Sequence, residues 1–212
     1  MAPLPGHLAA NPLPPGIAGA LGLSGYQLLA EVGGVGVGRL GPQVFLLAAS
    51  DPDPGAPDPG TQISLHNPRL REEAEVASWT QLAAQIGYLR LSGYRVVLER
   101  DGLRSHLSLL NPATGAVALR IPARHGGRLF GSGASAPRLL ASLRTLPPAG
   151  PPPDTQNPEL LHQVVLALAL QDPDLYAEQA VALADRAVGM ARENPALDPP
   201  AALAAAKAGD GG

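Results

Sequence analysis

The chain has 212 residues, 45% of them hydrophobic, so it is long enough to bury the core of one ordinary domain. It contains no cysteine, which excludes disulfides, thiolate metal ligands and a cysteine nucleophile. The formal net charge is −3, but residues 90–146 carry nine arginines against two acids, whereas residues 147–212 carry nine acids against three bases.

Residues 1–25 are rich in proline, glycine and alanine and carry almost no charge, so we predict a flexible N-terminal segment. This segment lacks the basic start and the continuous apolar run of a signal peptide. No stretch of the chain approaches the roughly 18 apolar residues of a transmembrane helix. We therefore expect a cytoplasmic protein that does not bind membranes.

A glycine run, GGVGVGRLG at residues 33–41, contains a G-x-G-x-x-G motif that starts at Gly36. A dinucleotide site needs a helix directly after such glycines, because the helix N-terminus holds the pyrophosphate. Here strand-like segments lie on both sides, at 26–32 and 43–50. A kinase-like glycine loop needs a nearby lysine, and the single lysine is Lys207. We predict a glycine-rich turn between two strands, and no cofactor.

Residues 51–61 contain the sequence PDPG twice, which predicts an exposed loop. The aspartates of this loop lack the spacing and the closing glutamate of a calcium loop, and the five histidines of the chain form no H-x-x-x-H pair. No metal site is expected. The chain also contains no G-x-S-x-G, and it offers no convincing acid–base pair. The sequence indicates no catalytic residue, which argues against an enzyme without excluding one.

The clearest predicted unit is a helix followed by three antiparallel strands. One helix start is indicated at Asn67 and Pro68. The stronger start is Ser78, which opens a capping box before apolar residues at helical spacing, and Gly93 is the expected end of the helix. Strands are predicted at 94–100, 103–110 and 116–123, joined by an Asp101-Gly102 turn and the loop NPATG.

The registers that these turns set pair Leu98 with Ser105 and Leu107 with Leu119, which separates apolar from polar side chains. The predicted apolar face consists of Tyr94, Val96, Leu98, Leu107, Leu109, Val117, Leu119 and Ile121. The predicted polar face consists of Arg95, Glu99, Arg104, His106 and Arg120. On that face Glu99 is expected to form a cross-strand ion pair with Arg104.

A glycine-rich loop with Arg124, His125 and Arg128 follows, and then a helix over residues 136–146 that carries Arg138. The order helix, three strands, helix is similar to that of double-stranded RNA-binding domains, and this resemblance in topology implies binding of duplex RNA. The family carries a lysine cluster at the start of its last helix. This chain departs from that pattern, since it has only arginines there.

A proline-rich linker is predicted at residues 147–156, followed by a C-terminal helical pair at 157–194 and a flexible tail at 195–212. The first helix of the pair is apolar on nearly all sides, so it must be buried. It packs either on the hairpin at 26–50 or at a subunit interface. The second arrangement predicts self-association.

The predicted fold is an α+β domain at residues 26–146, in which a hairpin and a three-stranded meander form an antiparallel sheet, with a basic αβββα module at about 76–146. The leading functional hypothesis is a non-enzymatic binding protein whose arginine-rich sheet face takes a polyanion such as nucleic acid, or an acidic protein partner. The alternative is a self-associating adaptor or regulatory module whose basic region pairs with acidic protein surfaces, without nucleic acid. The candidate anion-binding residues are Arg95, Arg104, His106, Arg120, Arg124, His125, Arg128 and Arg138.

Overall fold

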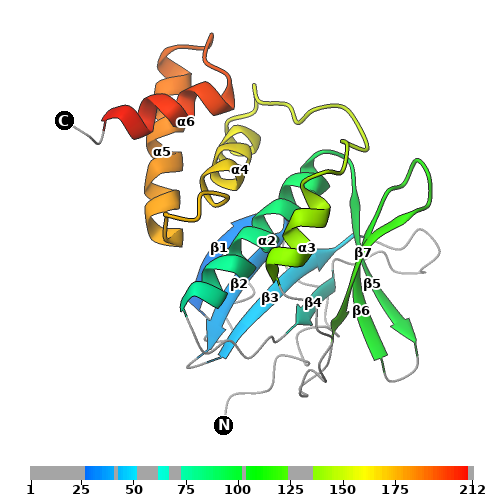
Figure 1. Ribbon diagram of the computed structural model, residues 1–212. Coiled ribbons are helices and arrows are strands. Elements are labelled where there is room, and N and C mark those ends of the chain that lie inside the picture. Colours follow the sequence, from blue (N-terminus) through cyan, green and yellow to red (C-terminus); the bar gives the residue numbers. More distant parts are fainter. Residues whose placement is uncertain are drawn as a thin grey trace.

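Two antiparallel sheets, two helices that cover them and a group of C-terminal helices make up the fold (Figure 1). The computed structural model describes residues 27–40, 43–51, 62–66, 73–101, 104–123 and 136–209. These residues form a four-stranded sheet, a three-stranded sheet and five helices. The predicted α+β class is therefore confirmed.

The first sheet has the strand order β1-β2-β3-β4, with β1 Gln27–Val32, β2 Val35–Leu40, β3 Gln43–Ser50 and β4 Gln62–His66. The prediction of a turn over 33–41 is wrong for most of that run, because β2 passes through it. Only Gly33 and Gly34 form the turn, with φ angles of 56° and 73°. A two-residue hairpin turn of type I′ needs positive φ at both positions, which glycine adopts without strain. The valines of the run then alternate inward, and Val35 and Val37 are buried.

The second sheet has the strand order β5-β6-β7, with β5 Arg95–Asp101, β6 Arg104–Leu110 and β7 Val117–Ala123. Both predicted registers are wrong by two residues: Leu98 pairs with Leu107, and Leu107 pairs with Ile121. The predicted turn position is wrong as well, because the first ladder continues to the pair Asp101 and Arg104. Side chains alternate with a period of two, so a shift of two residues leaves the predicted faces unchanged.

Two details of this sheet do change with the register. Glu99 pairs with His106, so the expected partnership with Arg104 is wrong. The β6–β7 register also shifts between Leu109 and Leu110, and beyond this irregularity Val117 is 43% exposed. A bulge displaces the alternation of one strand relative to its partner, which explains why Val117 does not reach the core.

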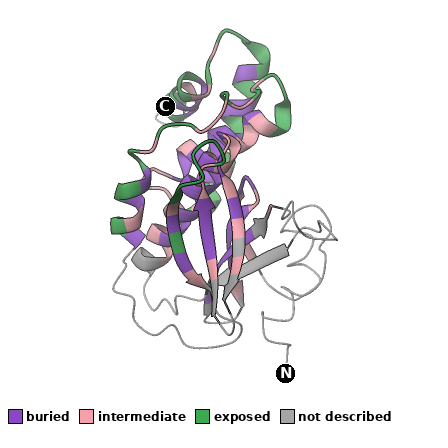
Figure 2. Cartoon of the chain, turned by 90° about the vertical axis from the view of Figure 1, so that its right-hand side faces the viewer, coloured by how far each residue is buried: buried purple, intermediate pink, exposed green. Residues whose placement is uncertain are grey.

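Two helices, α2 (Glu73–Leu91) and α3 (Ala136–Leu143), cover the apolar sides of the sheets. The prediction that Ser78 caps the first helix is wrong, because α2 begins five residues earlier, in a run of good helix formers. Figure 2 shows the buried residues running along the strands and under these helices. The core includes Val37 and Leu46 of the first sheet, Val96, Leu107 and Leu109 of the second, Leu82, Ile86 and Leu89 of α2, and Leu140 and Leu143 of α3.

The predicted C-terminal helical pair is present as α4 (Pro158–Ala169) and α5 (Ala177–Glu193). The prediction of a flexible tail at 195–212 is wrong for α6, which spans Pro199–Ala208. Asp198 caps this helix by accepting a hydrogen bond from the backbone N–H of Ala201 at 2.8 Å, and two prolines occupy its first turn, where their missing N–H costs nothing.

The nearly all-apolar α4 is buried within the chain. It packs against α2 and β1 on one side and against α5 and α6 on the other, and its core residues include Leu161, Val165 and Leu166. The apolar surface of α4, which led to the prediction of a subunit interface, is therefore covered by other parts of the same chain. None of the described helices is long and apolar enough to cross a membrane.

The proline-rich segment between α3 and α4 lies against the end of α2. The backbone N–H groups of Ala149 and Gly150 both donate to the carbonyl oxygen of Ser92, at 3.0 and 2.9 Å. The Tyr94 hydroxyl donates to the carbonyl oxygen of Pro147 at 2.9 Å. These bonds fix the path of the chain as it passes from the sheets to the C-terminal helices.

Candidate functional site

The outer face of β5–β7, the side turned away from the core, carries the polar side chains of the meander. Arg95 and Glu99 come from β5, His106 and Ser108 from β6, and Arg120 from β7. Arg120 is 52% exposed, Arg95, Glu99 and His106 are half-buried, and Ser108 is buried. Three of the basic residues predicted from the sequence therefore share one sheet surface.

A carboxylate at the centre of this face organises its charges. Glu99 Oε2 accepts a hydrogen bond from the Ser108 hydroxyl at 2.6 Å and lies 2.8 Å from Arg120 Nη2. The buried serine fixes the carboxylate, and the carboxylate orients the guanidinium. Because a guanidinium has five N–H donors in a planar fork, Arg120 retains donors that can reach a ligand.

The remaining predicted anion-binding residues fall into two groups. Arg104 occupies a position on the same face by its place in the β5–β6 ladder, although its side chain lies outside the described residues. Arg138 is exposed on α3. The opposite side of α3, with Leu140 and Leu143, packs into the core that the inner sheet face also lines, so Arg138 is not brought to the outer face. The loop residues Arg124, His125 and Arg128 lie outside the described residues.

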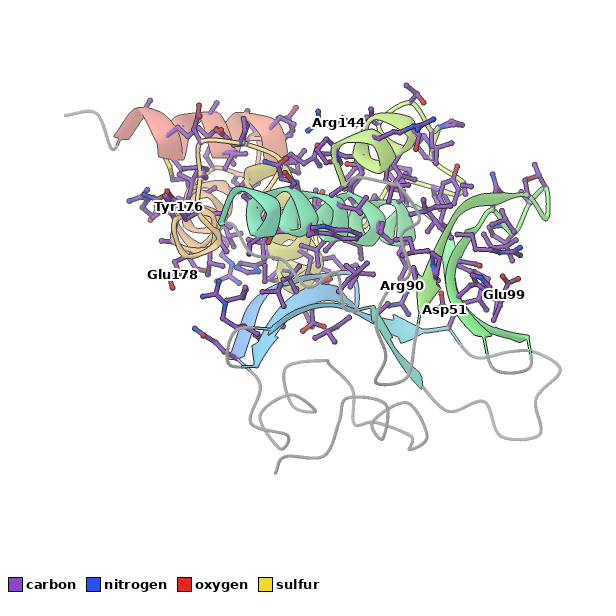
Figure 3. The ribbon with its side chains drawn as sticks, turned by 60° about the horizontal axis from the view of Figure 1, so that its bottom comes forward. Asp51, Arg90, Glu99, Arg144, Tyr176 and Glu178 are labelled. Atoms are coloured by element: carbon purple, nitrogen blue, oxygen red, sulfur yellow. The ribbon has the colours of Figure 1, made fainter. Side chains whose placement is uncertain are left out.

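The sequence reasoning missed a polar junction between the two sheets (Figure 3). Arg90 Nη2 at the end of α2 lies 2.7 Å from Asp51 Oδ1, and Arg90 Nη1 donates to the carbonyl oxygen of Gly33 at 2.7 Å. Asp51 Oδ2 accepts from the backbone N–H of Val96 at 2.8 Å, and the Asp51 N–H donates to the Val96 carbonyl at 2.7 Å. The signal available in the sequence was that Arg90 is the only charged residue of the helix after residue 75.

The described surface also has two hollows that the sequence did not indicate. One, of about 200 Å³, lies between β1, β2, the start of α2 and the connection from α4 to α5. The other is a groove between α4 and α5, where His162 Nε2 lies 2.9 Å from Asp185 Oδ1. Within the described parts of the chain, no group of three histidine, aspartate or glutamate side chains is placed to hold a metal ion.

Comparisons of the chain with known protein families, with curated proteins and with solved structures found no match. The order α2-β5-β6-β7-α3 is present as predicted, but the topological similarity to double-stranded RNA-binding domains has no counterpart in these comparisons.

Proposed function

We propose that this protein is a non-enzymatic binding protein that holds a polyanion, in the first instance a nucleic acid duplex, on the outer face of β5–β7. The observation that carries the proposal is the placement of Arg95, His106 and Arg120 on one face of one sheet, with the backbone position of Arg104 at its hairpin end. Guanidinium groups suit this task because their planar fork matches phosphate oxygens.

The position of the acidic residues also supports the proposal. The segment from α4 to α6, residues 158–208, holds seven of the nine acids of residues 147–212. Its helices pack on α2 and β1, whereas β5–β7 contacts β3, β4 and α3 (Figure 1). The basic sheet and the acidic helices therefore lie on different sides of α2. A polyanion can approach the outer face without first displacing those helices.

The test is a salt titration of the full chain with labelled DNA and RNA duplexes of mixed sequence, followed by fluorescence anisotropy. The double variant Arg95→Gln/Arg120→Gln is expected to lower the slope of log affinity against log salt by about two, roughly 0.9 for each phosphate that the variant no longer neutralises. The matched control Arg138→Gln/Arg144→Gln removes the same charge from α3 and the residue that follows it, and it is expected to retain most of the salt dependence. Absence of binding at low salt, or equal losses in both variants, would overturn the proposal.

A second variant tests the central carboxylate in the opposite direction. Glu99→Gln removes the carboxylate that lies 2.8 Å from Arg120, so the face loses one negative charge and its affinity for either duplex is expected to rise. Weaker binding by this variant would show that the orientation of Arg120 matters more than the charge of the face, and circular dichroism would confirm that the variant is folded.

The separation of charge favours a second candidate function, self-association. The acidic helices of one copy can face the basic sheet of another, which gives a head-to-tail contact between unlike surfaces. Light scattering at increasing salt tests it without any nucleic acid. A mass above that of the monomer at low salt, lost at high salt, is expected. A constant monomer mass would exclude this candidate.

A further inference from the structure

The hollow next to the start of α5, here called the Tyr176 pocket, lies far from the outer face of β5–β7. Its volume is about 200 Å³, and three parts of the chain that are distant in sequence form its walls. Figure 3 shows Tyr176 and Glu178 at one end of α2 and Arg90 near the other end. Its lining includes Leu28, Leu29, Arg39, Leu175, Tyr176 and Glu178.

A bulge in β1 builds the apolar wall of this pocket. The β1–β2 register shifts between Leu28 and Ala30, which leaves Leu29 as an extra residue. Consecutive residues of a regular strand point to opposite faces, yet Leu28 and Leu29 both line the pocket. Bulges commonly redirect side chains in this way beside binding sites. Leu175 adds apolar surface from the α4–α5 connection.

Tyr176 stands at the edge of the pocket with its backbone fixed and its ring in solvent. Its N–H donates to Gln179 Oε1 at 3.0 Å, and its carbonyl oxygen accepts from the N–H of Ala180 at 2.9 Å. The residue is nevertheless 68% exposed, more than any other large hydrophobic residue in the described part of the chain. Tyrosine on a rigid backbone is a common source of binding energy at protein interfaces, because it loses little conformational entropy on contact.

The sequence on both sides of Tyr176 is acidic. Asp174 and Glu178, two residues to either side of Tyr176, are both exposed. On the opposite wall, Arg39 already makes an interaction within the chain. Glu178 lines the pocket, and its carboxylate favours a cation beside the apolar group of a ligand.

We propose that the Tyr176 pocket binds a protein partner through one large apolar side chain that has arginine or lysine next to it in the sequence. The size of the pocket supports this class of ligand, since pockets that enclose a whole drug-sized molecule measure about 300–1,000 Å³. A single anchoring side chain needs less room, and it leaves the neighbouring residues of the partner free to contact the acidic rim. The proposal is independent of the polyanion proposal, because it concerns a different surface.

The test uses the ¹⁵N-labelled full chain and three capped pentapeptides, followed by NMR. Gly-Arg-Phe-Arg-Gly is expected to shift the backbone signals of the Tyr176 pocket. Gly-Arg-Ala-Arg-Gly is expected to bind about tenfold to hundredfold more weakly, because it buries no large side chain. Gly-Glu-Phe-Glu-Gly is expected to bind more weakly than the first peptide, because its charges repel the rim.

Two protein variants locate the effect. Tyr176→Ala is expected to weaken binding of the phenylalanine peptide by about fivefold or more. Met190→Ala removes another exposed hydrophobic side chain from α5 and serves as the matched control. Both side chains are exposed, so both variants are expected to fold. Equal binding of the phenylalanine and alanine peptides, shifts that map elsewhere, or N-acetylphenylalanine amide binding as tightly as the peptide would overturn the proposal, the last by indicating a small-molecule site.

Discussion

Gly87 in the middle of α2 lies against the turn between β1 and β2, and replacing it with alanine tests this contact. A Cβ atom on Gly87 would overlap the carbonyl oxygen of Val32 and lie 2.7 Å from its carbonyl carbon. The contact is reciprocal, since a Cβ on Gly33 would lie 3.0 Å from the carbonyl carbon of Gly87. Both obstacles are backbone, so the hairpin and the helix must separate to admit the methyl group.

Two opposing effects set the size of the change. Overpacking costs about 1–3 kcal/mol, and alanine gains about 0.5–1 kcal/mol over glycine in a helix interior. We therefore expect Gly87→Ala to lower the free energy of unfolding by about 1–2 kcal/mol, and Tm by roughly 2–8 °C for a chain of this length. Gly189→Ala in α5 is the matched control, because a Cβ there meets no atom within 4 Å. That variant is expected to be more stable by about 0.5–1 kcal/mol.

Urea unfolding followed by circular dichroism measures both variants under the same conditions. The prediction is one of opposite signs for the same substitution in two helices. If Gly87→Ala stabilises the protein as much as Gly189→Ala does, the β1–β2 turn does not pack on α2, and the position of the first sheet is wrong.

Three further predictions concern packing and charge. Asp51→Ala removes the acceptor that joins the two sheets and is expected to cost about 2 kcal/mol in urea unfolding; an unchanged midpoint would contradict the junction. Val117→Thr is expected to change stability by less than about 0.5 kcal/mol, whereas Leu119→Ala is expected to cost about 2–5 kcal/mol, and similar costs would contradict the register. The Lys207 ammonium lies 2.7 Å from Asp172 Oδ2, and this hydrogen bond is the main cause of the lowered pKa of that carboxyl group. A lowered carboxyl pKa stabilises the fold above the usual aspartate value, so Lys207→Gln is expected to cost about 0.5 kcal/mol at neutral pH. That difference should disappear as the pH falls through the pKa of Asp172, and a difference that persists in strong acid would contradict it.

The sequence predicted the faces of the meander better than its pairing. Val96, Leu107 and Ile121 are buried as expected, because alternation is a local property that survives a shift of two residues. The turn position depends on whether Asp101 ends the strand or stays in the ladder, and the pattern Asp-Gly does not decide this. Val117 was misplaced because a bulge is not visible in an alternating sequence.

Other differences arise from contacts between distant parts of the chain. Arg90 and Asp51 are 39 residues apart, and no spacing rule brings them together. The glycine run predicts a turn because glycine usually interrupts strands. In the structure, glycine is needed at the Gly33-Gly34 turn for a further reason, since this turn packs on α2 at Gly87 with no room for a side chain. The sequence alone does not show this contact. By contrast, the start of α6 could have been predicted from the sequence, since Asp198 and the two prolines after it form an ordinary helix start. The alanine-rich composition of the tail led to the prediction of a flexible segment instead.

The arrangement of charge in the fold also separates the two candidate functions of the basic sheet. A polyanion contacts only the outer face of β5–β7, whereas head-to-tail association also needs the acidic helices. Glu159 and Glu193 are exposed on α4 and α5, and replacing both with glutamine makes the acidic side less negative without touching the sheet. This variant is expected to lose self-association at low salt and to bind nucleic acid as well as the parent or slightly better, since the long-range repulsion between the protein and phosphate falls. Loss of nucleic-acid binding in this variant would mean that the acidic helices take part in that complex, which is incompatible with a site confined to the sheet.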